Sequence, residues 1–146
     1  MKPTAIREFP VWSYDDASDE LKKKILNNMY DINVDYEWWE CIFDDAKEIG
    51  LKIEGFDIDN RTIEGKLTDD VDSVIKSIKE NHGDVCDTYK LADGYKQEES
   101  EEFEYDLLQE YLSILQKEYD WRTSEEQIIE TIQVNEYLFN ANGEIA

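Results

Sequence analysis

Few residues of this sequence combine the types and the spacing that chemistry needs. His82 is the only histidine, and Cys86 follows it by four residues. A cysteine nucleophile requires a histidine base and a third group that orients this base. Gly83 and Asp84 lie between the two residues and interrupt any helix face that they could share. We therefore expect a histidine at a helix end beside a half-buried thiol, and no catalytic residue.

The short motifs of phosphate, metal and serine chemistry are also missing. The sequence contains no G-x-S-x-G, no glycine-rich phosphate loop and no H-E-x-x-H. Cys41 and Cys86 belong to no C-x-x-C pair, so neither zinc nor redox chemistry is indicated. Two isolated cysteines without a signal peptide are typical of reduced thiols in a cytoplasm. We expect no cofactor and no membrane-spanning segment.

Closely spaced carboxylates could bind a hard cation. An EF-hand loop counted from Asp57 fails, because Arg61 takes the fifth position, Thr62 replaces the required glycine and Thr68 takes the twelfth position. The acids at 69–72 suit the first turn of a helix, where the helix dipole favours negative charge. We expect no metal site. Acids are so abundant that the sequence indicates no particular carboxylate pair for glycoside hydrolysis.

Net charge is the extreme feature of the chain. It carries 37 acidic and 15 basic residues, for a net charge of −22, and residues 98–146 alone carry 14 acids and 2 bases. Such a field repels nucleic acids and anionic membranes and attracts basic surfaces. The alternative is that the charge serves solubility alone. At 40% hydrophobic residues, the chain nevertheless holds enough apolar material to fold.

The stretch from 98 to 116 contains seven acids and no base. Helical spacing gathers its apolar residues on one side, namely Phe103, Leu107, Leu108, Tyr111, Ile114 and Leu115. The other side carries Glu99, Glu102, Asp106 and Glu110, which we name the acidic ridge. Successive carboxylates lie ~6 Å apart there, repel one another, and can imitate a nucleic-acid backbone. We predict that the acidic ridge binds a partner; the alternative is a plain solvated face.

Trp38 and Trp39 cannot both point inward from one helix. Helical spacing places Trp39 on the inner stripe, which leaves Trp38 partly exposed or packed under a neighbouring segment. An exposed tryptophan is a common anchor of protein interfaces. Trp38 is therefore the candidate aromatic anchor for a partner, with packing in the core as the alternative.

The elements that must position these residues follow from the hydrophobic periodicity. We predict one α+β domain over 1–146, with about four to six helices packed on a small, mainly antiparallel sheet. Its central feature is a hairpin over 51–67, with a bulge at Gly55 where the alternation slips by one residue. Helices are expected after an N-cap at Ser18, over about 36–49, after an N-cap at residue 68 or 69, over about 99–119, and after a capping box at 123–126. Residues 84–97 are a helix or a loop, and short strands are expected at 4–9 and 136–139.

Several segments resemble a family of small acidic proteins encoded by bacteriophages and integrated mobile elements. They are EWW at 37–39, DDAKEIGLKIEGFDID at 44–59, LQKEY at 115–119 and NEYLF at 135–139. The resemblance implies a phage-associated context in a bacterial host cell and transfers no catalytic residue. Small acidic phage proteins include inhibitors of host defence, such as anti-CRISPR and anti-restriction proteins.

Charge and resemblance together predict a non-enzymatic inhibitor of a host defence nuclease complex. The acidic ridge would occupy a basic, nucleic-acid-binding surface of a CRISPR effector or a restriction enzyme, as a nucleic-acid mimic. One alternative is an antitoxin-like or scaffolding protein that neutralises a basic partner protein. A small enzyme that uses carboxylates and a metal is the third hypothesis.

Overall fold

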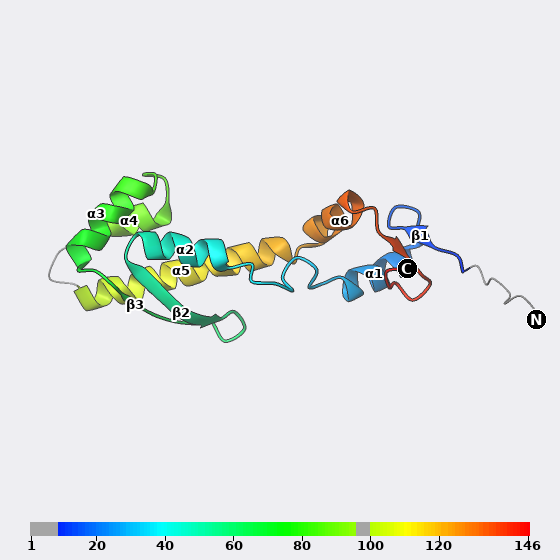
Figure 1. Cartoon of the computed structure of the whole chain (residues 1–146), viewed down its shortest axis with the longest axis horizontal. Helices are drawn as coiled ribbons and strands as arrows, with labels where there is room; N and C mark the ends of the chain where they lie inside the picture. Colours follow the sequence, from blue (N-terminus) through cyan, green and yellow to red (C-terminus); the bar gives the residue numbers. More distant parts are fainter. Residues whose placement is uncertain (1–8, 96–99) are drawn as a thin grey trace, which may run out of the picture. The chain divides into compact units, whose positions relative to one another are not determined.

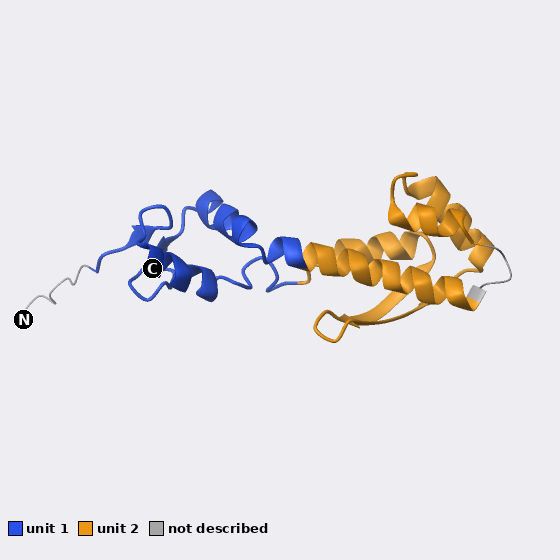
Figure 2. Cartoon of the chain, turned by 180° about the vertical axis from the view of Figure 1, so that it is seen from behind, with its two compact units in different colours: residues 1–36, 120–146 blue, residues 37–119 orange. Residues whose placement is uncertain are grey.

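The chain divides into two compact units, which Figure 2 colours separately. The computed structural model describes residues 9–95 and 100–146. Unit 1 comprises residues 1–36 and 120–146, and unit 2 comprises residues 37–119. Because the chain enters unit 2 from unit 1 and then returns, each terminus belongs to unit 1.

The described part of unit 2 contains a hairpin, three shorter helices and most of a long helix, which can be followed in Figure 1. Its elements are α2 (Glu40–Glu48), β2 (Leu51–Asp57), β3 (Thr62–Leu67), α3 (Val71–Asn81), α4 (Asp87–Asp93) and α5 (Ser100–Arg122), of which α5 continues into unit 1 at residue 120. Both α2 and the hairpin lie along α5. The hairpin pairs Leu51 with Leu67 and Asp57 with Thr62 in antiparallel register, and the register shifts between Ile53 and Gly55. The predicted bulge is therefore confirmed.

The core of unit 2 forms around the apolar stripe of α5. Phe103, Leu107 and Tyr111 are fully buried there. They pack in one cluster with residues of α2, the α2–β2 turn, the hairpin and α3, namely Ala46, Ile49, Leu51, Ile53, Val74 and Ile78. Each of these segments contributes apolar side chains at the spacing of its own secondary structure, so a single cluster joins helix and hairpin.

Unit 1 is built from segments of both chain ends. Its elements are β1 (Trp12–Ser13), α1 (Asp19–Asn28), α6 (Glu125–Val134) and β4 (Leu138–Phe139). β1 pairs with β4 in antiparallel register, and Phe139 also bridges Ile145. Ser18 caps α1 by accepting from the Leu21 amide, and Ser124 caps α6 by accepting from the Gln127 amide.

A separate apolar cluster holds unit 1 together. Its buried members are Ala17, Leu21, Ile25, Met29, Ile128, Ile132 and Phe139. They come from α1 and its C-cap, from α6 and β4, and from the turn that precedes α1. The two units therefore have distinct hydrophobic cores.

The α+β class is confirmed, and so is the hairpin over 51–67. The described residues form six helices and two separate two-stranded antiparallel sheets, where a single small sheet was expected. The strand expected at 4–9 lies almost wholly outside the described residues; within them, the first strand of unit 1 is β1, Trp12–Ser13. The single domain over 1–146 stays a prediction, because two cores joined by a continuous helix can still unfold together.

Over residues 9–95 and 100–146, no helix combines the length and the apolar character needed to cross a membrane.

Gly50 ends α2 and starts the hairpin, and we predict that it tolerates no side chain. Its φ is +92°, and a Cβ there would lie 2.9 Å from Asp69 Oδ2 and 3.0 Å from Val74 Cγ2. Gly50→Ala should therefore lower the free energy of unfolding by about 1–2 kcal/mol or more, since left-handed backbone is costly for L-residues. Urea denaturation measures this change.

Gly83→Ala is the matched control, because a Cβ at Gly83 meets nothing within 4 Å. Its effect should stay within about 0.5 kcal/mol. Equal effects of the two substitutions would contradict the assignment of strain to Gly50.

Candidate functional site: the acidic ridge and a histidine-centred polar network

The structure exposes the acidic ridge unevenly. Glu99 lies outside the described residues. Glu102 is exposed on α5, whereas Asp106 and Glu110 are half-buried. The Tyr95 hydroxyl donates a hydrogen bond to Asp106 Oδ2, so this carboxylate already has a partner inside unit 2. Among the described members of the ridge, Glu102 alone is exposed.

Glu110 occupies an unfavourable position for a charge. Burial raises the pKa of its carboxyl group, and the nearby Asp87 carboxylate raises it further, while Lys117 acts in the opposite direction. Both raising effects disfavour the ionised form. The helical wheel explains the burial, because Glu110 is the ridge residue closest to the apolar stripe. The ridge is thus less continuous than helical spacing suggested.

Of the two outcomes expected for Trp38, partial exposure as an interface anchor or packing under a neighbouring segment, the structure shows the second. Its side chain is 6% exposed and lies at the centre of an aromatic cluster, whereas Trp39 is half-buried. The Trp38 ring centroid lies 5.7 Å from those of Trp39 and Phe56 and 5.8 Å from that of Tyr119. A ring enclosed in this way cannot anchor a partner without rearrangement, so the alternative of core packing is confirmed.

The start of the helix explains why helical spacing did not decide between the two outcomes. Helix α2 begins at Glu40 with Trp39 as its N-cap, so Trp38 precedes the helix and does not follow its periodicity. The slipped alternation at Gly55 could have indicated this aromatic cluster from the sequence. The bulge there allows the Phe56 ring to pack against Trp39 and Phe43.

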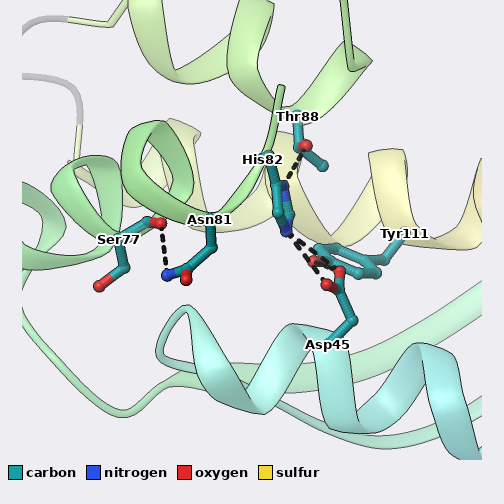
Figure 3. Close-up of polar contacts among 6 residues, drawn as sticks. All are labelled: Asp45, Ser77, Asn81, His82, Thr88 and Tyr111. Carbon is teal, nitrogen blue, oxygen red and sulfur yellow. Dashed lines mark hydrogen bonds and ion pairs between the residues drawn. The ribbon is translucent and has the colours of Figure 1, made fainter. Parts of the chain in front are cut away.

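A polar network centred on His82 joins four helices of unit 2 (Figure 3). His82 Nε2 lies 3.2 Å from both carboxylate oxygens of Asp45 on α2. His82 Nδ1 lies 2.6 Å from Thr88 Oγ1 on α4, and the Tyr111 hydroxyl on α5 donates to Asp45 Oδ2 at 2.8 Å. An ionised carboxylate only accepts, so Nε2 carries hydrogen and the Nδ1 of a neutral ring accepts from Thr88.

The Thr88 hydroxyl, the His82 imidazole and the Asp45 carboxylate follow one another in the order of a catalytic triad, in which a histidine activates a hydroxyl nucleophile. Such a triad needs a hydroxyl that a substrate can reach. Thr88 is 3% exposed, and protein groups occupy both nitrogens of His82. The network therefore ties α2, α4 and α5 to His82, the residue that ends α3, and its hydroxyl is not available as a nucleophile.

Cys86 lies beside this network without joining it. It is exposed, and it lines a pocket of about 370 Å³ together with Asp45, His82 and Asp87. With both imidazole nitrogens engaged, His82 offers no lone pair to the Cys86 thiol. The part of the chain that the structure describes contains no group of three or more His, Cys, Asp or Glu side chains arranged to hold a metal ion.

Sequence reasoning placed His82 at a helix end, where it caps α3, but missed its partners. Asp45 lies 37 residues before His82 and Tyr111 lies 66 residues after Asp45. Nothing in the local pattern pairs them. The buried position of Tyr111 on the apolar stripe was the one available signal, because a buried tyrosine hydroxyl requires a hydrogen-bond partner.

Comparisons with models of protein families, with curated proteins and with solved structures found no match to this chain.

His82→Ala tests the stabilising role of the network. The substitution leaves the buried Thr88 hydroxyl without its partner, so the free energy of unfolding should fall by about 2 kcal/mol. Asn81→Ala is the control, since Asn81 is exposed and donates only to the Ser77 carbonyl at 2.9 Å. Urea denaturation compares the two variants, and equal stabilities would refute the assigned role.

Tyr111 gives the network a dependence on alkaline pH. Burial raises the pKa of its phenol far above the ordinary value, and the hydrogen bond to Asp45 and the negative charges of Asp45 and Cys86 raise it further. The unfolded chain loses this proton near pH ~10 and the folded chain does not. The unfolded state then binds fewer protons, so the stabilising contribution is complete below this pH and is lost progressively as the pH rises above it, towards the raised pKa of the folded state.

Tyr111→Phe should therefore reduce the loss of stability on going from pH ~9 to ~11. The measurement is urea denaturation at several pH values in this range. Tyr105→Phe, at an exposed tyrosine of the same helix, serves as the control and should leave the slope unchanged. An unchanged slope in Tyr111→Phe would contradict the assignment.

Proposed function

We propose that this protein acts by binding a basic surface of another protein, as an inhibitor of a host defence nuclease complex. Its target would be the nucleic-acid-binding surface of a CRISPR effector or a restriction enzyme, which makes this an anti-CRISPR or anti-restriction function. The observation that carries the proposal is the net charge of −22.

The described surface supports an electrostatic mode of binding. Exposed acids lie on or directly beside every helix, including Glu20 on α1, Asp44 on α2, Asp72 on α3, Glu102 on α5 and Glu126 on α6. In the described part of unit 2, four Lys–carboxylate ion pairs join exposed side chains; three of them have N···O distances of 3.9 Å, and the fourth, between Lys79 and Asp93, has 3.0 Å. Such pairs are weak in water, so they leave most of the negative field in place.

The mode of action follows from this field. Long-range attraction accelerates encounter with a basic groove and orients the protein in it, while direct contacts slow dissociation. Carboxylates that occupy phosphate positions would exclude the DNA or RNA of the target. In this proposal the acidic ridge contributes chiefly through Glu102, and the protein acts in the cytoplasm of a bacterial host cell in a phage-associated context.

The polar groups of the His82 network are already hydrogen-bonded to one another, and this favours a binding function over a catalytic one. An antitoxin-like or scaffolding protein that neutralises a basic partner would use the same charge, and only the identity of the partner separates the two functions.

Affinity capture from nuclease-treated host lysate across a salt series tests the proposal. A CRISPR or restriction subunit that moderate salt releases and added DNA or RNA displaces is the expected result. One small basic protein from the same genetic element would replace the proposal with the antitoxin-like function. Capture of no specific protein would leave solubility as the reason for the charge.

Glu102→Lys tests the acidic ridge against the captured partner. The reversal should weaken binding about threefold to tenfold at low salt, and the deficit should shrink as salt screens the charges. Glu48→Lys makes the same change of net charge at an exposed position outside the ridge and is the matched control. Equal losses in the two variants would mean that total charge, and not the ridge, governs binding.

A further inference from the structure

Unit 1 contains a small pocket that combines aromatic and apolar walls with carboxylates. Its volume is about 200 Å³, below the roughly 300–1,000 Å³ of sites for drug-sized ligands. It is lined by Tyr14 and Asp15 beside β1, by Ile132 near the end of α6, and by Glu136, Tyr137 and Leu138 around the start of β4. Among the described residues that line it, none is basic. The pocket has room for about one side chain.

The aromatic walls suit a cation. A positively charged group is attracted to the face of a tyrosine ring. Within the protein itself, the Lys22 ammonium lies 5.3 Å from the centroid of the Tyr14 ring. Lys22 does not line the pocket, so this contact leaves the pocket side of Tyr14 open to a second group. Tyr137 supplies a second ring, and Ile132 and Leu138 supply surface for an aliphatic stem.

The carboxylates strengthen this preference. Gln133 Nε2 donates to Asp15 Oδ1 at 3.0 Å, which holds the Asp15 carboxylate in place. Burial raises the pKa of the Tyr14 phenol, and the charges of Glu125, Asp15 and Asp19 raise it further. The contribution of the three carboxylates, though smaller than that of burial, reflects a negative potential around the ring. A cationic group in the pocket would therefore meet tyrosine side chains and negative charge together.

Glu136 occupies a backbone position that is unusual for a glutamate. Its φ is 55°, and its amide donates to the Gln133 carbonyl while the Tyr137 amide donates to the Ile132 carbonyl. These two bonds form a Schellman motif at the end of α6, in which glycine is the usual residue at this position. Glu136 therefore holds this position at a conformational cost.

From this arrangement we infer that the pocket receives one basic side chain, a lysine or an arginine, of the partner protein. Its aliphatic stem packs against Ile132 and Leu138, and its charged end lies between the tyrosine rings and the carboxylates of Asp15 and Glu136. The inference deepens the proposed function, on which it rests for the nature of the partner. It also supplies the aromatic contact that Trp38 cannot make.

A titration of the isotope-labelled full chain, followed by NMR, tests the pocket directly at ~150 mM salt. The probes are the amides of Nα-acetyl-lysine, Nα-acetyl-arginine and Nα-acetyl-norleucine, of which the last is a neutral analogue with an aliphatic side chain. At least one basic amide should produce saturable shifts at Tyr14, Glu136, Tyr137 and Leu138, and the norleucine amide should not. Equal shifts with the neutral amide, or shifts spread over all acidic surfaces, would overturn the inference.

Variants at the pocket sharpen the test. Glu136→Gln keeps the backbone and should weaken binding of the basic amide about threefold to tenfold, as should Tyr137→Leu, whereas Tyr137→Phe retains the ring and should bind normally. Glu144→Gln removes an exposed acid of unit 1 that does not line the pocket, and it should have no effect. Binding that is unchanged in Glu136→Gln would refute the assigned role of this carboxylate.

The same variants separate this inference from the proposed function. A basic partner captured equally by the natural chain and by Glu136→Gln would overturn the pocket and leave the proposed function standing. Saturable binding of a basic amide without capture of any basic partner would overturn the proposed function and leave the pocket standing.

Discussion

Burial of the apolar stripe of α5 is the interaction on which unit 2 depends. Phe103, Leu107 and Tyr111 are removed from water only because α2, the hairpin and α3 cover them with Ile49, Leu51 and Val74. Burial of this kind contributes roughly 1.5–3 kcal/mol for each large apolar side chain. Tyr111 brings a hydroxyl into this core, and the Asp45 carboxylate satisfies it from the edge. The polar network is therefore a consequence of the same packing.

The charge of the chain sets the opposing constraint. A net charge of −22 on 146 residues favours expansion through self-repulsion. The structure keeps most carboxylates at the surface and places several in first turns, where the helix dipole favours them, as at Asp19, Asp72 and Glu125. Carboxylates that approach the interior either accept a hydrogen bond, as Asp106 does, or have a raised pKa, as Glu110 does.

The pocket beside His82 in unit 2 and the pocket beside Tyr14 in unit 1 differ in how far hydrogen bonds within the protein already occupy their polar groups. In unit 2, Asp45, His82 and Thr88 bind one another, so their pocket offers little unused capacity to a ligand. In unit 1, the pocket is lined by tyrosine rings and by the carboxylates of Asp15 and Glu136, in a region of negative potential. The first arrangement stabilises the fold, and the second suits recognition of a positive charge.

The sequence by itself determined the α+β class, the hairpin with its bulge at Gly55, the cap at Ser18, the start of α6 near 123–126, and the apolar stripe of α5. These features depend on local periodicity and turn chemistry, which neighbouring residues encode. Only the tertiary structure decided that Trp38 is buried, that His82 meets Asp45, and that Tyr14 and Tyr137 line one pocket. Those outcomes join residues far apart in the chain, and they depend on where helices begin and how segments pack, which no local pattern records.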